Sequence, residues 1–122
     1  MLRSYLFLDG IQLICSSSKR VIMFVHHVFF WLKSTGGSEE TKQFEKGVNS
    51  LKEIKSIKIV EIGVPATTDR PVIDRSYSYS LLLLFENMAD HDAYQIDPIH
   101  TQFVADCAHL WERVQIYDSE TV

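Results

Sequence analysis

Histidines and tyrosines are the side chains of this 122-residue chain best suited to proton transfer near neutral pH. A histidine can remove a proton next to a carbonyl group, and a tyrosine hydroxyl can hydrogen-bond to the enolate oxygen that develops. His100 is the third residue of an expected helix, where the helix dipole favours the neutral imidazole that acts as a base. The alternative for His100 is a structural hydrogen bond at the apolar edge. A histidine base and a tyrosine donor together would need no cofactor for this proton transfer.

Residues that could bind a metal or form a disulfide are better explained in other ways. Asp90, His91 and Asp92 are consecutive, and consecutive helical residues point about 100° apart, so they cannot converge on one ion. A solvated helix face is the better interpretation. Cys15 and Cys107 lie far apart, without cysteine or histidine at ligand spacing, which predicts no disulfide and no metal site. We expect Cys107 to be a buried, inert thiol in a reducing compartment, the cytoplasm.

Two further pairs of residues could take part in catalysis or binding, but a structural role explains each pair more simply. Tyr77 and Tyr79 alternate in an expected strand, where one face would carry both rings and aromatic packing is more common than chemistry. Asp74 and Arg75 lie in a long loop and could reach the mouth of a pocket. We expect them to pair with each other at the surface instead.

Composition and charge predict one globular domain. The chain is 46% hydrophobic and 23% charged, and its length suits a single core. The net charge of −4 comes from scattered residues, with no cluster of lysine and arginine of the kind that follows a phosphate backbone. No segment reaches the roughly 18 apolar residues needed to span a bilayer. Nucleic acid and membrane are therefore not expected as partners.

The N-terminal 22 residues are expected to lie outside the domain. Met1 to Ile14 matches a signal peptide only poorly, because Asp9 and Gly10 interrupt its apolar run. Met23 stands directly before the first strong strand, which favours a misassigned start codon. We therefore predict an extension at 1–22, a domain at 23–119 and a tail at 120–122.

The first half of the domain predicts a strand and a helix. Phe24 to Leu32 (FVHHVFFWL) is dense in aromatic and β-branched residues and apolar on both faces, as in a strand covered on both sides. Ser38, followed by two glutamates, is typical of a helix N-cap. One apolar stripe follows at helical spacing: Phe44, Val48, Leu51 and Ile54.

The second half continues with strands and a broken helix. Strands are expected at 57–64, 77–85 and 113–117, with a loop at 66–76 that is long enough to suggest a function. Asn87 can cap a short helix over 88–95. Asp97 and Pro98 form a second N-cap, so the helix restarts there. The stripe of this second piece is Ile99, Phe103, Cys107, Leu110 and Trp111.

These elements predict an α+β fold of order β-α-β-β-α-β. Both helices pack on one face of a four-stranded antiparallel sheet, which leaves the other face open. Because the strands at 24–32 and 77–85 are apolar on both sides, this open face needs a cover that the chain does not supply. Pairing of two copies through the sheet, as a homodimer, is the simplest solution.

Two stretches then resemble the stress-responsive dimeric α/β-barrel family. They are HHVFFWLK at 26–33 and YQIDPIH at 94–100, with Phe103 following the second. The resemblance extends over 23–119. It implies two ferredoxin-like subunits whose sheets face each other as a barrel.

The resemblance also implies a site. A plant cyclase of this family closes a polyketide by aldol condensation without a cofactor, and its pocket residues correspond to His26, Tyr94 and His100 here. Only one of His26 and His27 can face the barrel interior, and the resemblance selects His26. His26 could instead be a satisfied strand histidine, and Tyr94 a core tyrosine. His27 is expected to be structural.

Two main functions remain open. One is a cofactor-independent lyase or cyclase acting on a carbonyl-bearing, largely apolar molecule, with His100 as base, oriented by Tyr94 and assisted by His26. The other is a non-catalytic, stress-associated dimer that binds a hydrophobic ligand or stabilises other proteins. A cofactor-free monooxygenase is a third alternative, although no residue set singles it out.

Overall fold

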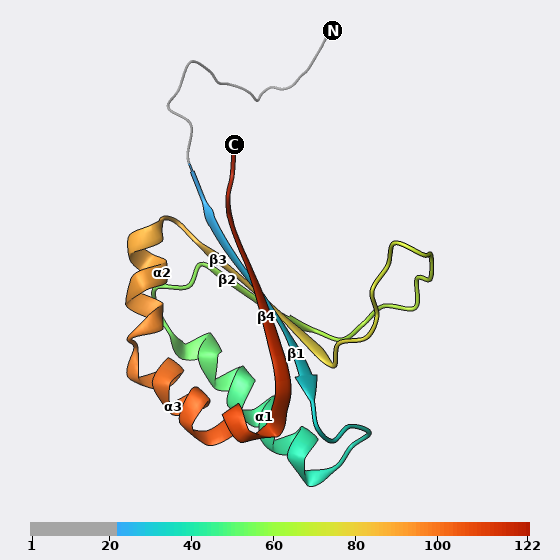
Figure 1. Ribbon diagram of the computed structural model, residues 1–122. Helices are drawn as coiled ribbons and strands as arrows, with labels where there is room; N and C mark the ends of the chain where they lie inside the picture. The colour runs from blue at the N-terminus through green and yellow to red at the C-terminus, as the bar shows by residue number, and fades with distance from the viewer. Residues whose placement is uncertain (1–21) are drawn as a thin grey trace, which may run out of the picture.

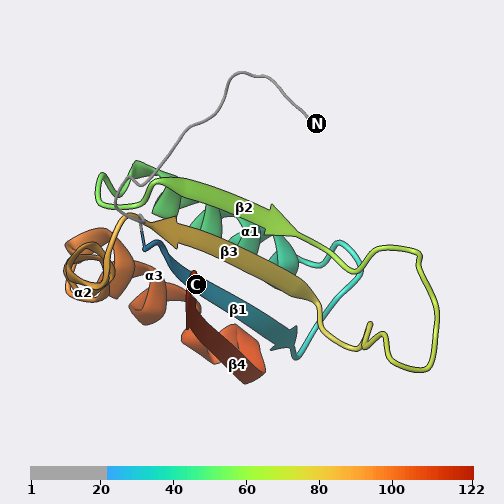
Figure 2. The ribbon, with the colours of Figure 1, turned by 90° about the horizontal axis from the view of Figure 1, so that it is seen from above.

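Four strands form one antiparallel sheet, and helices cover one of its faces (Figures 1 and 2). The computed structural model describes residues 22–122. Within this range the predicted order β-α-β-β-α-β is confirmed, and the fold is a ferredoxin-like α+β fold. Most of the extension predicted at 1–22 falls outside the described residues.

The strands lie in the order β2-β3-β1-β4. β1 (Phe24–Leu32) and β3 (Tyr79–Phe85) are central, while β2 (Ile59–Gly63) and β4 (Trp111–Glu120) form the edges. β1 has its predicted bounds, and β2 and β3 each begin two residues later than expected.

β4 is twice as long as the strand predicted at 113–117, because it pairs with β1 along almost its entire length. Trp111 therefore begins this strand and does not end the preceding helical stripe. Strand pairing also continues into the predicted tail. Glu120 lies opposite Phe24, and the N–H of Thr121 donates to the carbonyl of Met23.

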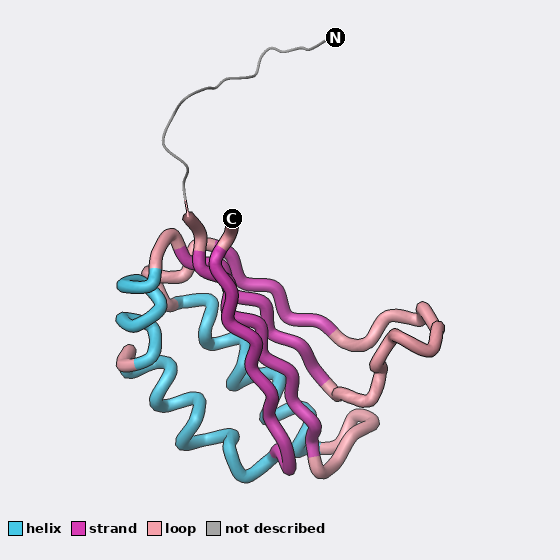
Figure 3. Tube along the Cα trace, turned by 45° about the horizontal axis from the view of Figure 1, so that its top comes forward, coloured by secondary structure: helices cyan, strands magenta, loops and turns pink. Residues whose placement is uncertain are grey.

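Three helices supply the covering layer, seen as one side of the two-layer arrangement in Figure 3. α1 (Glu39–Ser50) begins at the predicted cap, where Ser38 Oγ accepts a hydrogen bond from the N–H of Thr41 at 3.2 Å. A single turn of 3₁₀-helix, η2 (Leu51–Glu53), extends it. Its apolar stripe is buried against the sheet as predicted.

The second helical segment is broken where the sequence predicts. α2 (Met88–Gln95) ends before Asp97, whose carboxylate accepts from the N–H of Ile99 at 2.8 Å and starts α3 (Pro98–Cys107). The 3₁₀ turn η3 (Ala108–Leu110) then leads into β4. Because the chain changes direction at this break, the end of α2 and the start of α3 face each other.

The core lies between the helices and the sheet. Its fully buried side chains include Phe44, Leu83, Phe85 and Tyr94. Cys107 is buried as predicted, and burial raises the pKa of its thiol above the ordinary value. No helix within 22–122 has the length and apolar character to cross a membrane.

The opposite face of the sheet carries large apolar side chains that no helix covers. Its half-buried members on the central strands are Val25, Phe29, Trp31, Leu82 and Leu84. The loop between β2 and β3 bends to this same side of the sheet, away from the helices (Figure 1). The predicted open face is therefore present in the folded chain.

Two local predictions in and beside this loop are wrong. Tyr77 precedes β3 and packs on Phe29 at the open face, whereas Tyr79 packs on Phe44 in the core, so the two tyrosines do not share a face. Asp74 and Arg75 do not pair with each other. The Asp74 carboxylate accepts from Ser76, and Arg75 Nε donates to the carbonyl of Ala66, because the loop has free backbone groups that these side chains satisfy.

Candidate functional site

His26 lies on the helix-covered face of β1. It is 3% exposed, and its Nδ1 is 2.5 Å from Oδ1 of Asp118, the residue directly opposite on β4. His27 points to the open face, where its ring packs on Phe29. The prediction that His26 faces the interior between two sheets is therefore wrong. His26 instead contacts residues of α2 in its own chain, because this helix covers the face of the sheet on which His26 lies.

Tyr94 and His100 meet across the break between α2 and α3. Their ring centroids are 4.5 Å apart, and the ring of His26 lies 5.8 Å from that of Tyr94. The Nδ1 of His100 is 3.1 Å from the carbonyl oxygen of Gln95, the last residue of α2. The structure thus brings together all three residues that the sequence proposes.

The three side chains line one cavity of about 200 Å³ between sheet and helices. Apart from Gln95, the rest of its wall is apolar: Val28, Phe30, Leu81, Phe103, Val104, Trp111, Val114 and Ile116. A cavity with a few polar groups in an apolar wall suits a small, largely hydrophobic molecule with one reactive end.

Burial shifts the protonation equilibria of these groups. Burial is the largest influence on His26 and lowers its pKa, although the hydrogen bond to Asp118 opposes this effect. Burial also lowers the pKa of His100 and raises that of Tyr94. At neutral pH both histidines are therefore neutral, and the tyrosine keeps its hydroxyl proton.

The hydrogen-bond partners also fix where each imidazole proton lies. A carboxylate or a carbonyl oxygen only accepts, so the Nδ1 of His26 and the Nδ1 of His100 must each donate. The neutral form then carries its lone pair on Nε2. Each histidine can act as a base through this second nitrogen, and the ring of Tyr94 lies near both.

The sequence interpretation missed two residues near this site. His91 is 8% exposed, not solvated, and its ring lies 4.4 Å from that of Phe24 and 5.0 Å from that of His26. The i,i+3 spacing of His91 and Tyr94 places both on one helix face, a signal that could have revealed its burial. Asp118 lies just beyond the predicted end of the last strand, so its pairing with His26 was not foreseen.

His26, His91 and Asp118 are also the residues here that could hold a metal ion. Each offers one ligand atom, and these atoms all lie within 4.8 Å of one another. Of the three consecutive residues at 90–92, His91 belongs to this group, which it reaches from α2.

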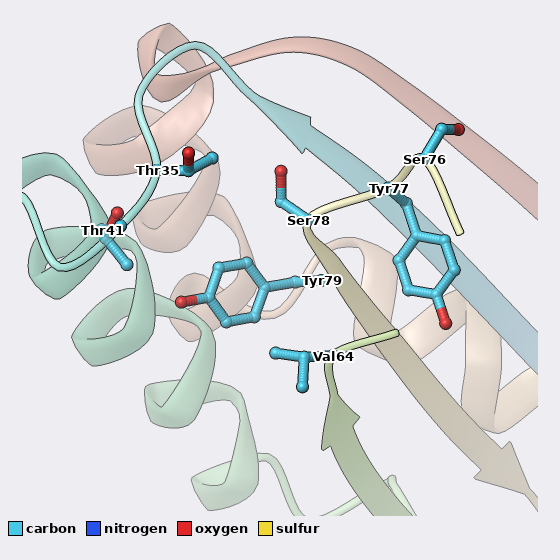
Figure 4. A pocket seen from close by; sticks show the side chains of 8 residues that line it. Thr35, Thr41, Val64, Ser76, Tyr77, Ser78 and Tyr79 are labelled. Carbon is cyan, nitrogen blue, oxygen red and sulfur yellow. The ribbon is translucent and has the colours of Figure 1, made fainter. Parts of the chain in front are cut away.

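A second cavity lies at the other end of the sheet and is lined mainly by hydroxyl side chains (Figure 4). Its volume is about 330 Å³. The hydroxyls serve the fold: Ser78 Oγ accepts from the N–H of Leu32, and the Tyr79 hydroxyl donates to Glu45 at 2.5 Å. Burial and then Glu45 raise the pKa of Tyr79 to about 12. This cavity therefore lacks a free base of the kind found in the first.

A family model for the stress-responsive A/B barrel domain matches residues 24–121. The chain belongs to this family. A comparison with curated proteins gave no match.

Solved structures of A/B barrel domain proteins and related folds resemble this chain. A ferredoxin-like family member from Mesorhizobium loti is 26% identical, with a TM-score of 0.69 over 83% of this chain and 98% of that one. A dimeric ferredoxin-like protein of unknown function from Thermobifida fusca is 16% identical (TM-score 0.66, 87% and 97% covered). The hydroxynitrile lyase of Passiflora edulis is 18% identical (TM-score 0.66, 82% and 94% covered).

All the residues around the cavity fall inside the part of the chain that matches the A/B barrel domain. The T. fusca protein is described as dimeric. At such identities the last two similarities show a shared fold and leave the chemistry of this chain to its own residues.

Proposed function

We propose that this A/B barrel domain is a small lyase or cyclase that needs no cofactor and acts on a carbonyl-bearing, largely apolar molecule. The observation that supports this most is the position of His26, Tyr94 and His100 around one apolar-walled cavity. Neutral histidines with a fixed proton on Nδ1 are suited to remove a proton at neutral pH.

The three residues have separate roles in this proposal. His100 takes a proton from a carbon next to a carbonyl group, and the electron pair of the broken C–H bond moves onto the carbonyl oxygen. The Tyr94 hydroxyl donates a hydrogen bond to that oxygen. In a cyclase the enolate carbon attacks a second carbonyl carbon, and the alkoxide that forms takes back the proton from His100. In a lyase the enolate re-forms its carbonyl group and makes a C=C bond to the neighbouring carbon, whose leaving group departs with its bonding electrons and takes that proton. His26, held by Asp118, assists the later proton transfer.

The hydroxynitrile lyase of similar fold supports the lyase class but does not name a substrate. Because the wall of the cavity is apolar, the part of the substrate away from the reacting group should be aliphatic or aromatic. We therefore expect β-polyketones with an apolar tail to be the first compounds to try.

We further infer that two copies associate through the open face. Phe29, Trp31 and Leu82 are only half-buried in the single chain, and a sheet face with such residues needs a cover. Similar folds are described as dimeric. The cavity lies on the other face, so each copy would keep a complete set of His26, Tyr94 and His100.

The test is a substrate screen with the wild type and the His100→Ala variant. Loss of a general base typically lowers the rate by about a hundredfold or more. His109→Ala is the matched control, because His109 is exposed in η3 and does not line the cavity. Activity that survives in His100→Ala contradicts the assignment of the base.

The apolar wall also favours a second function, the binding of a hydrophobic ligand without reaction. A fluorescent apolar probe displaced by the same compounds would show binding. Displacement by compounds that the wild type does not turn over favours a binding protein and contradicts the enzyme proposal.

A further inference from the structure

A compact group of three ligand side chains lies where α2 meets the paired ends of β1 and β4. His26 and Asp118 are opposite each other on the two strands, and His91 enters from the helix. Their ligand atoms lie within 4.8 Å of one another. Ligand atoms of one ion, each about 2.0–2.2 Å from it, are separated by roughly 3–4 Å. A limit of 4.8 Å is close to that range.

The burial of the group favours ligation by its histidines. His26 and His91 are both buried, whereas the Asp118 side chain is 43% exposed and so has room to adjust and a path for an ion from solvent. Within 22–122, the ion-pair partner of Asp118 is His26, and no lysine or arginine neutralises it.

Neighbouring groups already orient His91. Its Nδ1 is 3.1 Å from Oδ1 of Asp92, and its Nε2 is 3.3 Å from the side-chain nitrogen of Gln95. A carboxylate bonded to one ring nitrogen is the usual support for a histidine that binds metal through the other. The ring also stacks on Phe24, which restricts its rotation.

We propose that His26, His91 and Asp118 form a binding site for a divalent transition-metal ion of the zinc type. Two imidazoles and one carboxylate suit zinc, cobalt or nickel, whereas magnesium and calcium prefer oxygen ligands. Three protein ligands leave a further position for water. The site shares His26 and its partner Asp118 with the proposed reaction, but it does not include His100 or Tyr94. An ion there would nevertheless engage His26 and Asp118, and so would inhibit any proton transfer that uses them.

Binding of Zn²⁺ to the full chain, measured by titration calorimetry without substrate, tests this site. We expect one ion per wild-type chain and affinity at least about tenfold weaker in both His91→Gln and Asp118→Asn. Asp118→Asn changes a part-exposed side chain, so it keeps the test valid if His91→Gln does not fold. His27→Gln and His109→Gln are the matched controls and should bind as the wild type does, and Mg²⁺ should not bind.

Wild-type protein that binds no Zn²⁺, or folded His91→Gln and Asp118→Asn variants that both bind as the wild type, would overturn the site. These results would leave the substrate screen untouched. Conversely, loss of activity in His100→Ala gives no information on zinc, so the two proposals fail separately. Co²⁺ bound in place of Zn²⁺ should give visible absorption bands in the wild type that weaken in both ligand variants.

Discussion

His26 and His27 are neighbours in one strand and have opposite environments. His26 is buried beneath the helices, bonded to Asp118 and close to Tyr94. His27 lies on the open face, packed on Phe29, and only burial alters its pKa, which it lowers. The same residue type thus hydrogen-bonds to a carboxylate beside a cavity on one face and packs on an aromatic ring on the other.

On the proposals made above, the two faces of the sheet would serve two different tasks. The helix-covered face holds a cavity that is lined by residues of one chain. Within 22–122, the open face carries the apolar residues Val25, Phe29, Trp31, Leu82 and Leu84. We therefore expect mutations on the open face to change association first, and mutations on the covered face to change stability or chemistry.

The largest effect expected on the open face comes from a charge at Leu82. Leu82→Asp would place a carboxylate from each copy in an apolar interface, and burial of an unpaired charge costs several kcal/mol. The dimer dissociation constant should rise by at least about a thousandfold. Sedimentation at micromolar concentration should show a dimer for the wild type and a monomer for the variant. A wild-type monomer at that concentration would contradict the separation of tasks.

A smaller effect, on the free energy of unfolding, is expected when a mutation removes a large core side chain beneath the covered face. Phe44 is fully buried against Tyr79 and Phe30, so Phe44→Ala should lower the free energy of unfolding by about 3–5 kcal/mol. Urea unfolding at one fixed protein concentration measures this. Val72→Ala, at a side chain that is 81% exposed in the loop, is the control and should change stability by less than about 0.5 kcal/mol. Equal effects of the two substitutions would show that the covered face is not the core.

Much of the fold could be predicted because local signals agree with the tertiary structure. β1 has its predicted bounds, since its aromatic and β-branched run ends at a glycine-containing turn. The caps at Ser38, Asn87 and Asp97 all accept the expected backbone hydrogen bonds. Each of these features depends on residues only a few positions apart.

The site could be predicted only in part, for a related reason. His26, Tyr94 and His100 were proposed by resemblance and do lie together. The hydrogen bond between Asp118 and His26 was not predicted, because the register of β4 against β1 joins residues 92 positions apart and no local pattern encodes that register. His91 was not predicted to be buried, because its acidic neighbours Asp90 and Asp92 indicate a solvent-exposed helix face. In the structure its ring packs on Phe24 and is buried.

The proton positions on the imidazoles test the central claim most directly and need no substrate. Nitrogen NMR of the labelled chain at pH 7, with signals assigned through His26→Gln and His100→Gln, reports the tautomer and charge of each ring. The hydrogen bonds to Asp118 and Gln95 predict neutral rings with the proton on Nδ1 in both. Because burial lowers the pKa of each, both should titrate below 6.5. A ring protonated at pH 7, or one with its proton on Nε2, would contradict the account.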